Sequence, residues 1–193
     1  MNYPVQHHTN QPESMMNHLK YFFAVCAAAL LSACASPVEP SHYANEKPKL
    51  DLQQYFNGTL DAWGMFQDRS GKVVKRFTVV MRCTWVGDVG TLDEDFSYSD
   101  GSKQKRVWTL RKVAPDRYIG TAPDVVGEAI GITTGNVLHW QYVLALPVDG
   151  KVYDVKFNDW MYLMDDRVML NRAAMSKFGF HMGDVTLSFT KRP

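Results

Sequence analysis

The chain has 193 residues, with 21 Lys and Arg against 20 Asp and Glu, and a formal net charge of +1. This length accommodates one domain of ordinary size, and the near-zero charge gives no electrostatic basis for binding nucleic acid, which needs a basic excess or stripe. With 46% hydrophobic and 21% charged residues, the composition excludes a disordered chain and indicates a small globular protein.

Residues 1–33 have the features of a secretory signal peptide. The apolar run Tyr21–Leu31 follows Lys20 and precedes the small residues Ser32 and Ala33. A helix needs about 20 apolar residues to cross a bilayer, so this run is too short to span one, but it has the length of a signal-peptide core. We therefore predict a cleaved signal peptide over 1–33, for which Met15 or Met16 is a more typical start than Met1.

The string LSAC at Leu31–Cys34 resembles a bacterial lipobox. The resemblance implies cleavage before Cys34 and attachment of a lipid to its thiol. The second residue after the cysteine is Ser36, whereas an aspartate there is the familiar inner-membrane retention signal of enteric bacteria. The resemblance therefore implies a lipoprotein anchored in the outer membrane and facing the periplasm. The alternatives are an N-terminal anchor helix and a cleaved secretory signal with an incidental cysteine.

Residues 34–50 are predicted to be the lipidated cysteine and a flexible tether, because they contain three prolines and little apolar periodicity. The globular domain then covers 51–193, where Cys83 is the remaining cysteine. A lone cysteine forms no intramolecular disulfide. Cys83 alternates with apolar residues between Phe77 and Trp85, which favours a buried small hydrophobe over a catalytic thiol.

The region from 51 onward alternates between apolar strands and turn signals. Leu138, Trp140, Tyr142 and Leu144 occupy every second position, which is typical of a strand with one dry face. Gly, Asn and Asp residues recur between such segments and tolerate the positive φ angles of tight hairpins. We expect eight to ten strands, with helix near 52–56 and possible further helix over 173–178.

Consecutive antiparallel strands joined by short turns favour an all-β, up-and-down barrel of the calycin type, because closure removes exposed sheet edges. A two-sheet sandwich is the main alternative.

Four stretches carry a family resemblance: 56–77 (FNGTLDAWGMFQDRSGKVVKRF), 91–101 (TLDEDFSYSDG), 106–110 (RVWTL) and 159–179 (DWMYLMDDRVMLNRAAMSKFG). Together with the lipobox they resemble the bacterial lipoprotein family known as domain of unknown function 3833, over about 51–191. The resemblance implies a lipid-anchored envelope protein with a calycin-like barrel. It implies no catalytic residues, because the family has no established activity.

Motifs for catalysis, phosphate binding and metal binding are missing from the sequence. There is no phosphate-binding glycine loop, no nucleophile elbow and no metal-ligand spacing. His139 and His181 lie far apart in sequence. Each is expected to lie on the surface or to have its hydrogen bonds satisfied within the protein. The sequence therefore predicts no metal, no cofactor and no catalytic residue.

Charged residues on apolar strand faces are the candidate binding residues. Glu94, Glu128, Asp159 and Arg172 each alternate with apolar neighbours, and an unpaired charge in a dry interior is costly. One interpretation is an internal salt-bridge network, or outward-facing residues after a shift in register. The other is that Arg172 and a neighbouring tyrosine bind the head group of an amphiphile inside the barrel. The candidate ligand-binding set is Arg172, Tyr142, Glu94, Trp108, Trp140, Glu128 and Asp159, with the aromatic members alternatively filling the core.

Three functions are compatible with these features. The first is a periplasm-facing lipoprotein that binds a fatty acid or other amphiphile. The second is a non-catalytic envelope module that docks on an unknown protein partner, which predicts a filled barrel interior and an exposed apolar patch. The third is a barrel enzyme acting on a lipid, with Glu94 paired with Glu128 or Asp159 as general acid and base. We expect a membrane association through the lipid anchor and no nucleic-acid partner.

Overall fold

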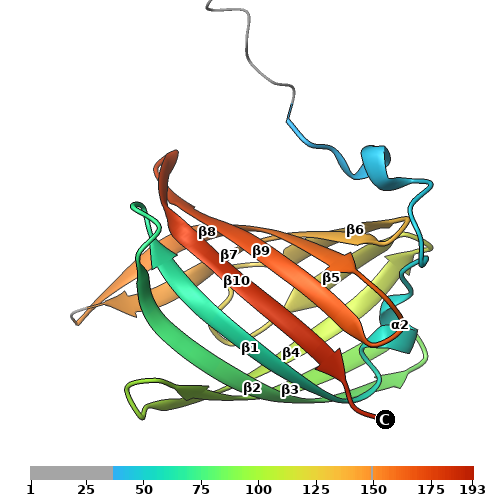
Figure 1. Ribbon diagram of the computed structural model, residues 1–193, viewed down its shortest axis with the longest axis horizontal. Coiled ribbons are helices and arrows are strands. Elements are labelled where there is room, and N and C mark those ends of the chain that lie inside the picture. Colours follow the sequence, from blue (N-terminus) through green and yellow to red (C-terminus); the bar gives the residue numbers. More distant parts are fainter. Residues whose placement is uncertain (1–36, 149) are drawn as a thin grey trace, which may run out of the picture. The chain divides into compact units, whose positions relative to one another are not determined.

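The computed structural model describes residues 37–148 and 150–193. The described strands form one closed antiparallel barrel in which each strand pairs with its neighbours in sequence and β1 closes on β10 (Figure 1). The elements are a 3-10 helix η1 (Pro40–Tyr43), helix α2 (Leu52–Tyr55), β1 (Gly58–Asp68), β2 (Val73–Val86), β3 (Val89–Tyr98), β4 (Lys103–Ala114), β5 (Arg117–Thr121), β6 (Ala129–Thr134), β7 (Val137–Val148), β8 (Lys151–Leu163), β9 (Val168–Lys177) and β10 (Phe180–Lys191).

The all-β barrel predicted from the sequence is confirmed, and the sandwich alternative is excluded. The alternating residues of β7 point as expected: Leu138, Trp140 and Leu144 are buried. Cys83 also lies in the core, 2% exposed, and burial raises the pKa of its thiol to about 12. A neutral, inaccessible thiol is what a small core hydrophobe provides.

Glycines on the inner faces of β5 and β6 make room for a large ring. An added Cβ at Gly131 would lie 2.3 Å from Cε3 of Trp140, and one at Gly120 would lie 2.4 Å from its Cζ2. The Trp140 indole therefore packs directly on the backbone of two neighbouring strands. Alternation of small and large inward residues is a common way to fill the interior of a small barrel.

We expect Gly131→Val to lower the free energy of unfolding by about 1–3 kcal/mol, because the added methyl groups displace the Trp140 ring from a packed position. Urea denaturation followed by tryptophan fluorescence measures the change. The control is Ile130→Val on the outer face, where Ile130 is 60% exposed, and it should stay within about 0.5 kcal/mol of the wild type. Equal stabilities for the two variants would contradict the tight contact.

Helix α2 covers one end of the barrel. The Asp51 carboxylate caps it by accepting hydrogen bonds from the backbone nitrogens of Gln53 (2.9 Å) and Gln54 (3.2 Å). Leu52 is fully buried, and the indole nitrogen of Trp85 donates to the carbonyl oxygen of Phe56 at 2.8 Å. The predicted helix near 52–56 is thus confirmed, and it closes the barrel end at which β1 begins.

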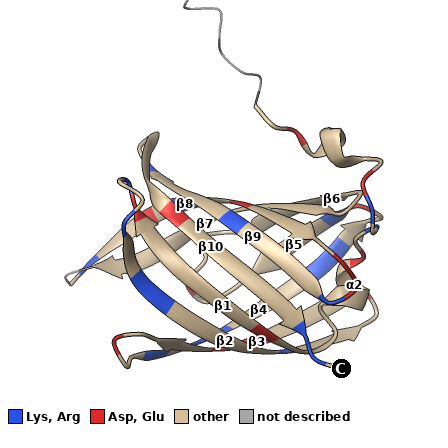
Figure 2. Ribbon diagram, in the orientation of Figure 1, with Lys and Arg blue, Asp and Glu red and all other residues tan. Residues whose placement is uncertain are grey.

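The opposite end carries the hairpins that join β1 to β2, β3 to β4, β7 to β8 and β9 to β10, and the longer connection from β5 to β6 (Figure 1). Several exposed apolar side chains lie at these hairpins: Val74, Val148, Val152, Phe178, Phe180 and Met182. Figure 2 shows charges of both signs spread over the strands and hairpins, with no continuous band of one sign in that view.

Two expectations from the sequence differ from the structure. The possible helix over 173–178 is wrong, because these residues belong to strand β9 and its turn, with Ala173 paired to Asp159 of β8. Part of the expected tether contacts the barrel: Leu50 is buried, its backbone nitrogen donates to the oxygen of Gly135, and Tyr43 packs against Trp160. Apolar side chains in this proline-containing segment explain the docking.

Residues 39–193 form one compact unit, which contains all ten of the strands described above. The predicted signal peptide and Cys34 lie outside the described residues. Within the described part of the chain, no helix has both the length and the apolar character needed to cross a membrane.

Candidate functional site

The barrel encloses a cavity of about 1290 Å³ that runs from Phe56, beside α2, to the hairpin end. At the hairpin end its lining includes Val74, Val148, Val152 and Met182, all of which are at least 45% exposed, so the cavity opens there. The walls are mainly apolar and aromatic. Side chains therefore do not fill this barrel, and its volume suits a small organic ligand.

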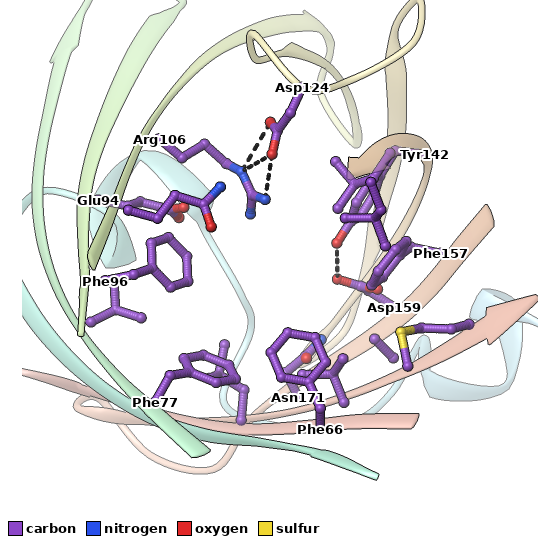
Figure 3. Close-up of a pocket in the computed structure, with 18 of the residues that line it drawn as sticks. Phe66, Phe77, Glu94, Phe96, Arg106, Asp124, Tyr142, Phe157, Asp159 and Asn171 are labelled. Carbon is purple, nitrogen blue, oxygen red and sulfur yellow. Dashed lines mark hydrogen bonds and ion pairs between the residues drawn. The ribbon is translucent and has the colours of Figure 1, made fainter. Parts of the chain in front are cut away.

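A group of polar side chains lies inside the cavity among the aromatic rings (Figure 3). We call these residues the polar cluster: Glu94 of β3, Arg106 of β4, Asp124 of the β5–β6 connection, Tyr142 of β7, Asp159 of β8 and Asn171 of β9. The cluster draws on most of the barrel circumference, so the closed fold is what brings its members together.

The strongest contact in the polar cluster joins Arg106 to Asp124. The guanidinium Nε lies 3.0 Å from both carboxylate oxygens, and Nη2 lies 2.6 Å from Oδ2. The two side chains are only 14% and 24% exposed. Asp124 is held in place because its connection runs along β7, where the Ala145 nitrogen donates to the Asp124 backbone oxygen at 2.9 Å. The pair is a bidentate ion pair with little solvent screening.

A second contact joins Tyr142 to Asp159, whose Oδ2 accepts a hydrogen bond from the tyrosine hydroxyl at 3.2 Å. Three other buried atoms of the cluster have no hydrogen-bond partner among the described residues: Oδ1 of Asp159, Oε2 of Glu94 and Nδ2 of Asn171. Buried polar atoms in folded proteins are nearly always paired with protein, water or ligand. The polar cluster therefore has unused hydrogen-bonding capacity.

Burial controls the protonation of the two carboxyl groups. Desolvation raises the pKa of Glu94 to about 7, although the nearby Arg106 opposes the shift. Desolvation likewise raises the pKa of Asp159 to about 7, against the lowering effect of the hydrogen bond from Tyr142. A charged carboxylate is destabilised in a poorly solvated site unless a positive charge or donor compensates it.

The aromatic candidates line the same cavity. Trp108 packs edge-on against Trp140, with ring centroids 5.8 Å apart, and against Tyr142 at 5.4 Å. The structure thus brings together five of the residues selected from the sequence: Glu94, Trp108, Trp140, Tyr142 and Asp159.

The prediction that Arg172 faces the interior is wrong. Its side chain is 75% exposed and lies 3.8 Å from Asp184 on the outer surface. The inward residues of β9 are Met169, Asn171 and Ala173. The outer face of β9 carries Val168 and Leu170. Because these two residues are apolar, the sequence pattern indicated that this face was the buried one.

Glu128 is also outside the barrel. It precedes β6, its side chain is 53% exposed, and its carboxylate lies 3.5 Å from Arg111. The alternation argument failed here because residues 126–128 are not in a strand, so every-second-residue spacing sets no common face.

Sequence reasoning missed Arg106, Asp124 and Asn171. The alternation of Arg106, Trp108 and Leu110 along β4 is a signal that places Arg106 inward with the two apolar side chains. No local pattern identifies Asp124, because its position depends on how the β5–β6 connection packs on β7.

Metal binding finds no support in the polar cluster. In residues 37–148 and 150–193, no group of three or more His, Cys, Asp or Glu side chains could hold a metal ion.

Comparison with known proteins identifies a family and a fold. The model of the family described as protein of unknown function (DUF3833) matches residues 28–191. No curated protein matches the chain. Among solved structures, an S-type phycobiliprotein lyase from Guillardia theta superimposes with a TM-score of 0.54 and 8% identity, covering 81% of this chain and 98% of the lyase. A de novo designed fluorescence-activating β-barrel has a TM-score of 0.41 and 13% identity, covering 74% of this chain and 99% of the design. At these identities the lyase shares the fold.

Proposed function

This chain belongs to DUF3833, a family of proteins of unknown function. From its cavity we propose that the barrel binds one amphiphilic small molecule, with an apolar chain and a polar head. We propose further that the protein binds this molecule without converting it. The observation that carries this proposal is the unfilled interior of about 1290 Å³, with apolar walls surrounding an incompletely hydrogen-bonded polar cluster. An apolar wall with a few convergent polar groups is the usual composition of a small-molecule site.

The cavity weighs against the docking-module alternative, which predicts a filled interior. An enzyme remains the second candidate, because Glu94 and Asp159 both have a pKa raised to about 7 inside a cavity, where general acids and bases operate. An enzyme predicts that Glu94→Gln accumulates an unconverted molecule, so organic extracts of the variant and the wild type would differ. Identical extracts would exclude Glu94 as the catalytic group.

We also propose that the protein is an outer-membrane lipoprotein anchored through Cys34 and facing the periplasm. Support comes from the short apolar run, the LSAC string and Ser36, and from a family match that begins at residue 28 and so includes the string. Such an anchor would place the cavity close to a source of amphiphiles.

Native mass spectrometry tests the binding proposal directly. The chain from Ala35 onward contains the whole compact unit, and it is purified without detergent. We expect a stoichiometric adduct that extracts into organic solvent. A clean apo mass, together with no uptake of added amphiphiles, would refute the proposal.

Ala173→Trp is expected to weaken ligand binding at least tenfold. Ala173 is 2% exposed, lines the cavity and pairs with Asp159, so an indole there occupies the space beside the polar cluster. Titration with a fluorescent apolar probe measures the affinity. The matched control is Arg172→Trp, which places the same ring on the outer surface and should leave the affinity unchanged. Equal affinity of both variants would contradict binding inside the barrel.

A further inference from the structure

The charge balance of the cavity interior limits which head group it accepts. Arg106 is the one cation in the polar cluster, and Asp124 already binds it through Nε and Nη2. Glu94 and Asp159 remain as two further carboxyl groups without a cation of their own. The other charged residues of the lining, Lys75, Lys103 and Asp68, lie in or next to the hairpins at the mouth, and Lys75 pairs with Asp100 there.

We propose that the polar cluster recognises a head group rich in hydrogen-bond donors, namely an amine or other cationic group, and excludes a free carboxylate. This inference rests on the proposed function, since it assumes that the cavity binds an amphiphile. It assigns the head-group contacts to Glu94 and Asp159, in place of the exposed Arg172.

The unpaired atoms of the cluster support this choice. Two of its three unpaired atoms, Oε2 of Glu94 and Oδ1 of Asp159, are acceptors without a partner among the described residues, and the third, Nδ2 of Asn171, is a donor. A primary ammonium offers three donors and no acceptor, so it matches an unpaired carboxylate oxygen better than any anionic group does. A carboxylate would add a third uncompensated negative charge to a site with little solvent, which is strongly unfavourable.

Among the described residues, the groups around the two carboxyl groups compensate their negative charge only in part. Glu94 faces Arg106 of β4 and Asp124 of the β5–β6 connection, which together are close to neutral. Asp159 faces Tyr142 of β7 and Asn171 of β9, which carry no charge, and the charge of Arg106 also acts to lower its pKa. Both groups belong to the wall of one cavity, Glu94 on β3 and Asp159 on β8, so a cation that enters the cavity has a carboxyl group to bind on either wall.

The apolar walls provide for the chain of the ligand. Phe66, Phe77 and Phe96 line the cavity toward the mouth, and Leu92, Leu110 and Leu138 line it toward α2. The polar cluster lies between these two groups of side chains along the strands. An alkyl chain attached to the head group therefore contacts apolar side chains whether it extends toward the mouth or toward α2.

The test compares three ligands with the same decyl chain: decylamine, decanol and sodium decanoate. Isothermal titration calorimetry at about pH 8 is suitable, because Glu94 and Asp159 are then mostly ionised and the alkylammonium, like lysine, stays protonated. We expect decylamine to bind at least tenfold more tightly than decanoate, with decanol between them. Decanoate binding as tightly as decylamine would overturn the head-group proposal.

Isosteric variants show which residues cause the preference for decylamine over decanoate. Glu94→Gln and Asp159→Asn remove one charge each without changing the shape of the site, and each is expected to reduce the preference for decylamine at least threefold. Arg172→Ala is the outer-surface control and should leave the preference unchanged. A preference that survives the double replacement of Glu94 and Asp159 would overturn the assignment. Failure of all three ligands to bind would instead refute the proposed function.

Discussion

Replacing Arg106 with methionine is expected to lower the free energy of unfolding by about 3 kcal/mol. The methionine keeps most of the apolar contact along the side chain, including packing near the Phe96 ring, but removes the charge that binds Asp124. The three acidic groups of the polar cluster are then left without a cation in the cluster. The expected loss is at the low end for a broken buried ion pair, because the Asp124 side chain keeps 24% of its surface exposed. Urea denaturation measures it.

An exposed ion pair on a neighbouring strand is the control for this experiment. Arg82 contacts Asp95 at 2.6 Å, but their side chains are 58% and 45% exposed, so Arg82→Met should leave the free energy of unfolding nearly unchanged. Adding Asp124→Leu to Arg106→Met should recover part of the lost stability, because it removes the orphaned carboxylate. If the double variant were no more stable than the single one, the pair would not be the source of the loss.

The stability of the protein is expected to fall as the pH rises from about 5 to about 8. Burial raises the pKa of Glu94 from 4.5 and of Asp159 from 3.8, each to about 7 in the folded state. Between those values the folded state binds more protons than the unfolded state, so the free energy of unfolding decreases with pH. For one such carboxyl the full effect is roughly 3 to 4 kcal/mol. This contribution is fully present below the unfolded values and is lost as the pH passes about 7.

The matching variant is the double replacement Glu94→Gln and Asp159→Asn, which removes both titrating groups at nearly constant shape. Denaturation curves at about pH 5 and about pH 8 should then differ much less than in the wild type. Asp95→Asn serves as control, because Asp95 is on the outer surface and its pKa is lowered by Arg82, away from this pH window. An unchanged pH slope in the double variant would show that the two carboxyl groups are not buried as the structure places them.

The family and the barrel were predictable from the sequence, because both depend on local patterns. Alternation with period two placed Glu94 on the face with Leu92 and Phe96, and that face is interior. The turns at glycine and aspartate residues separated the strands at the right places. Period-two alternation is enforced by the pleat of a strand, so it remains visible in a single sequence.

The candidate site was only partly predictable. Arg172 was misassigned because β9 carries apolar residues on both faces, with Leu170 43% exposed on the outside and Met169 fully buried. Hydrophobicity alone does not distinguish the two faces of such a strand. Asp124 gave no signal because it lies in a connection, where no backbone periodicity fixes the direction of a side chain.

The sequence by itself determined which strands form and which residues of most strands share a face, since these properties depend on residues two apart. Only the tertiary structure decided that the interior is hollow and that Glu94, Arg106, Asp124 and Asp159 meet inside it. Those residues come from separate strands and one connection, so their distances depend on how the sheet closes. The physical reason is that hydrogen-bonded closure of β1 on β10 fixes the barrel radius, and the radius sets the space left between the side chains.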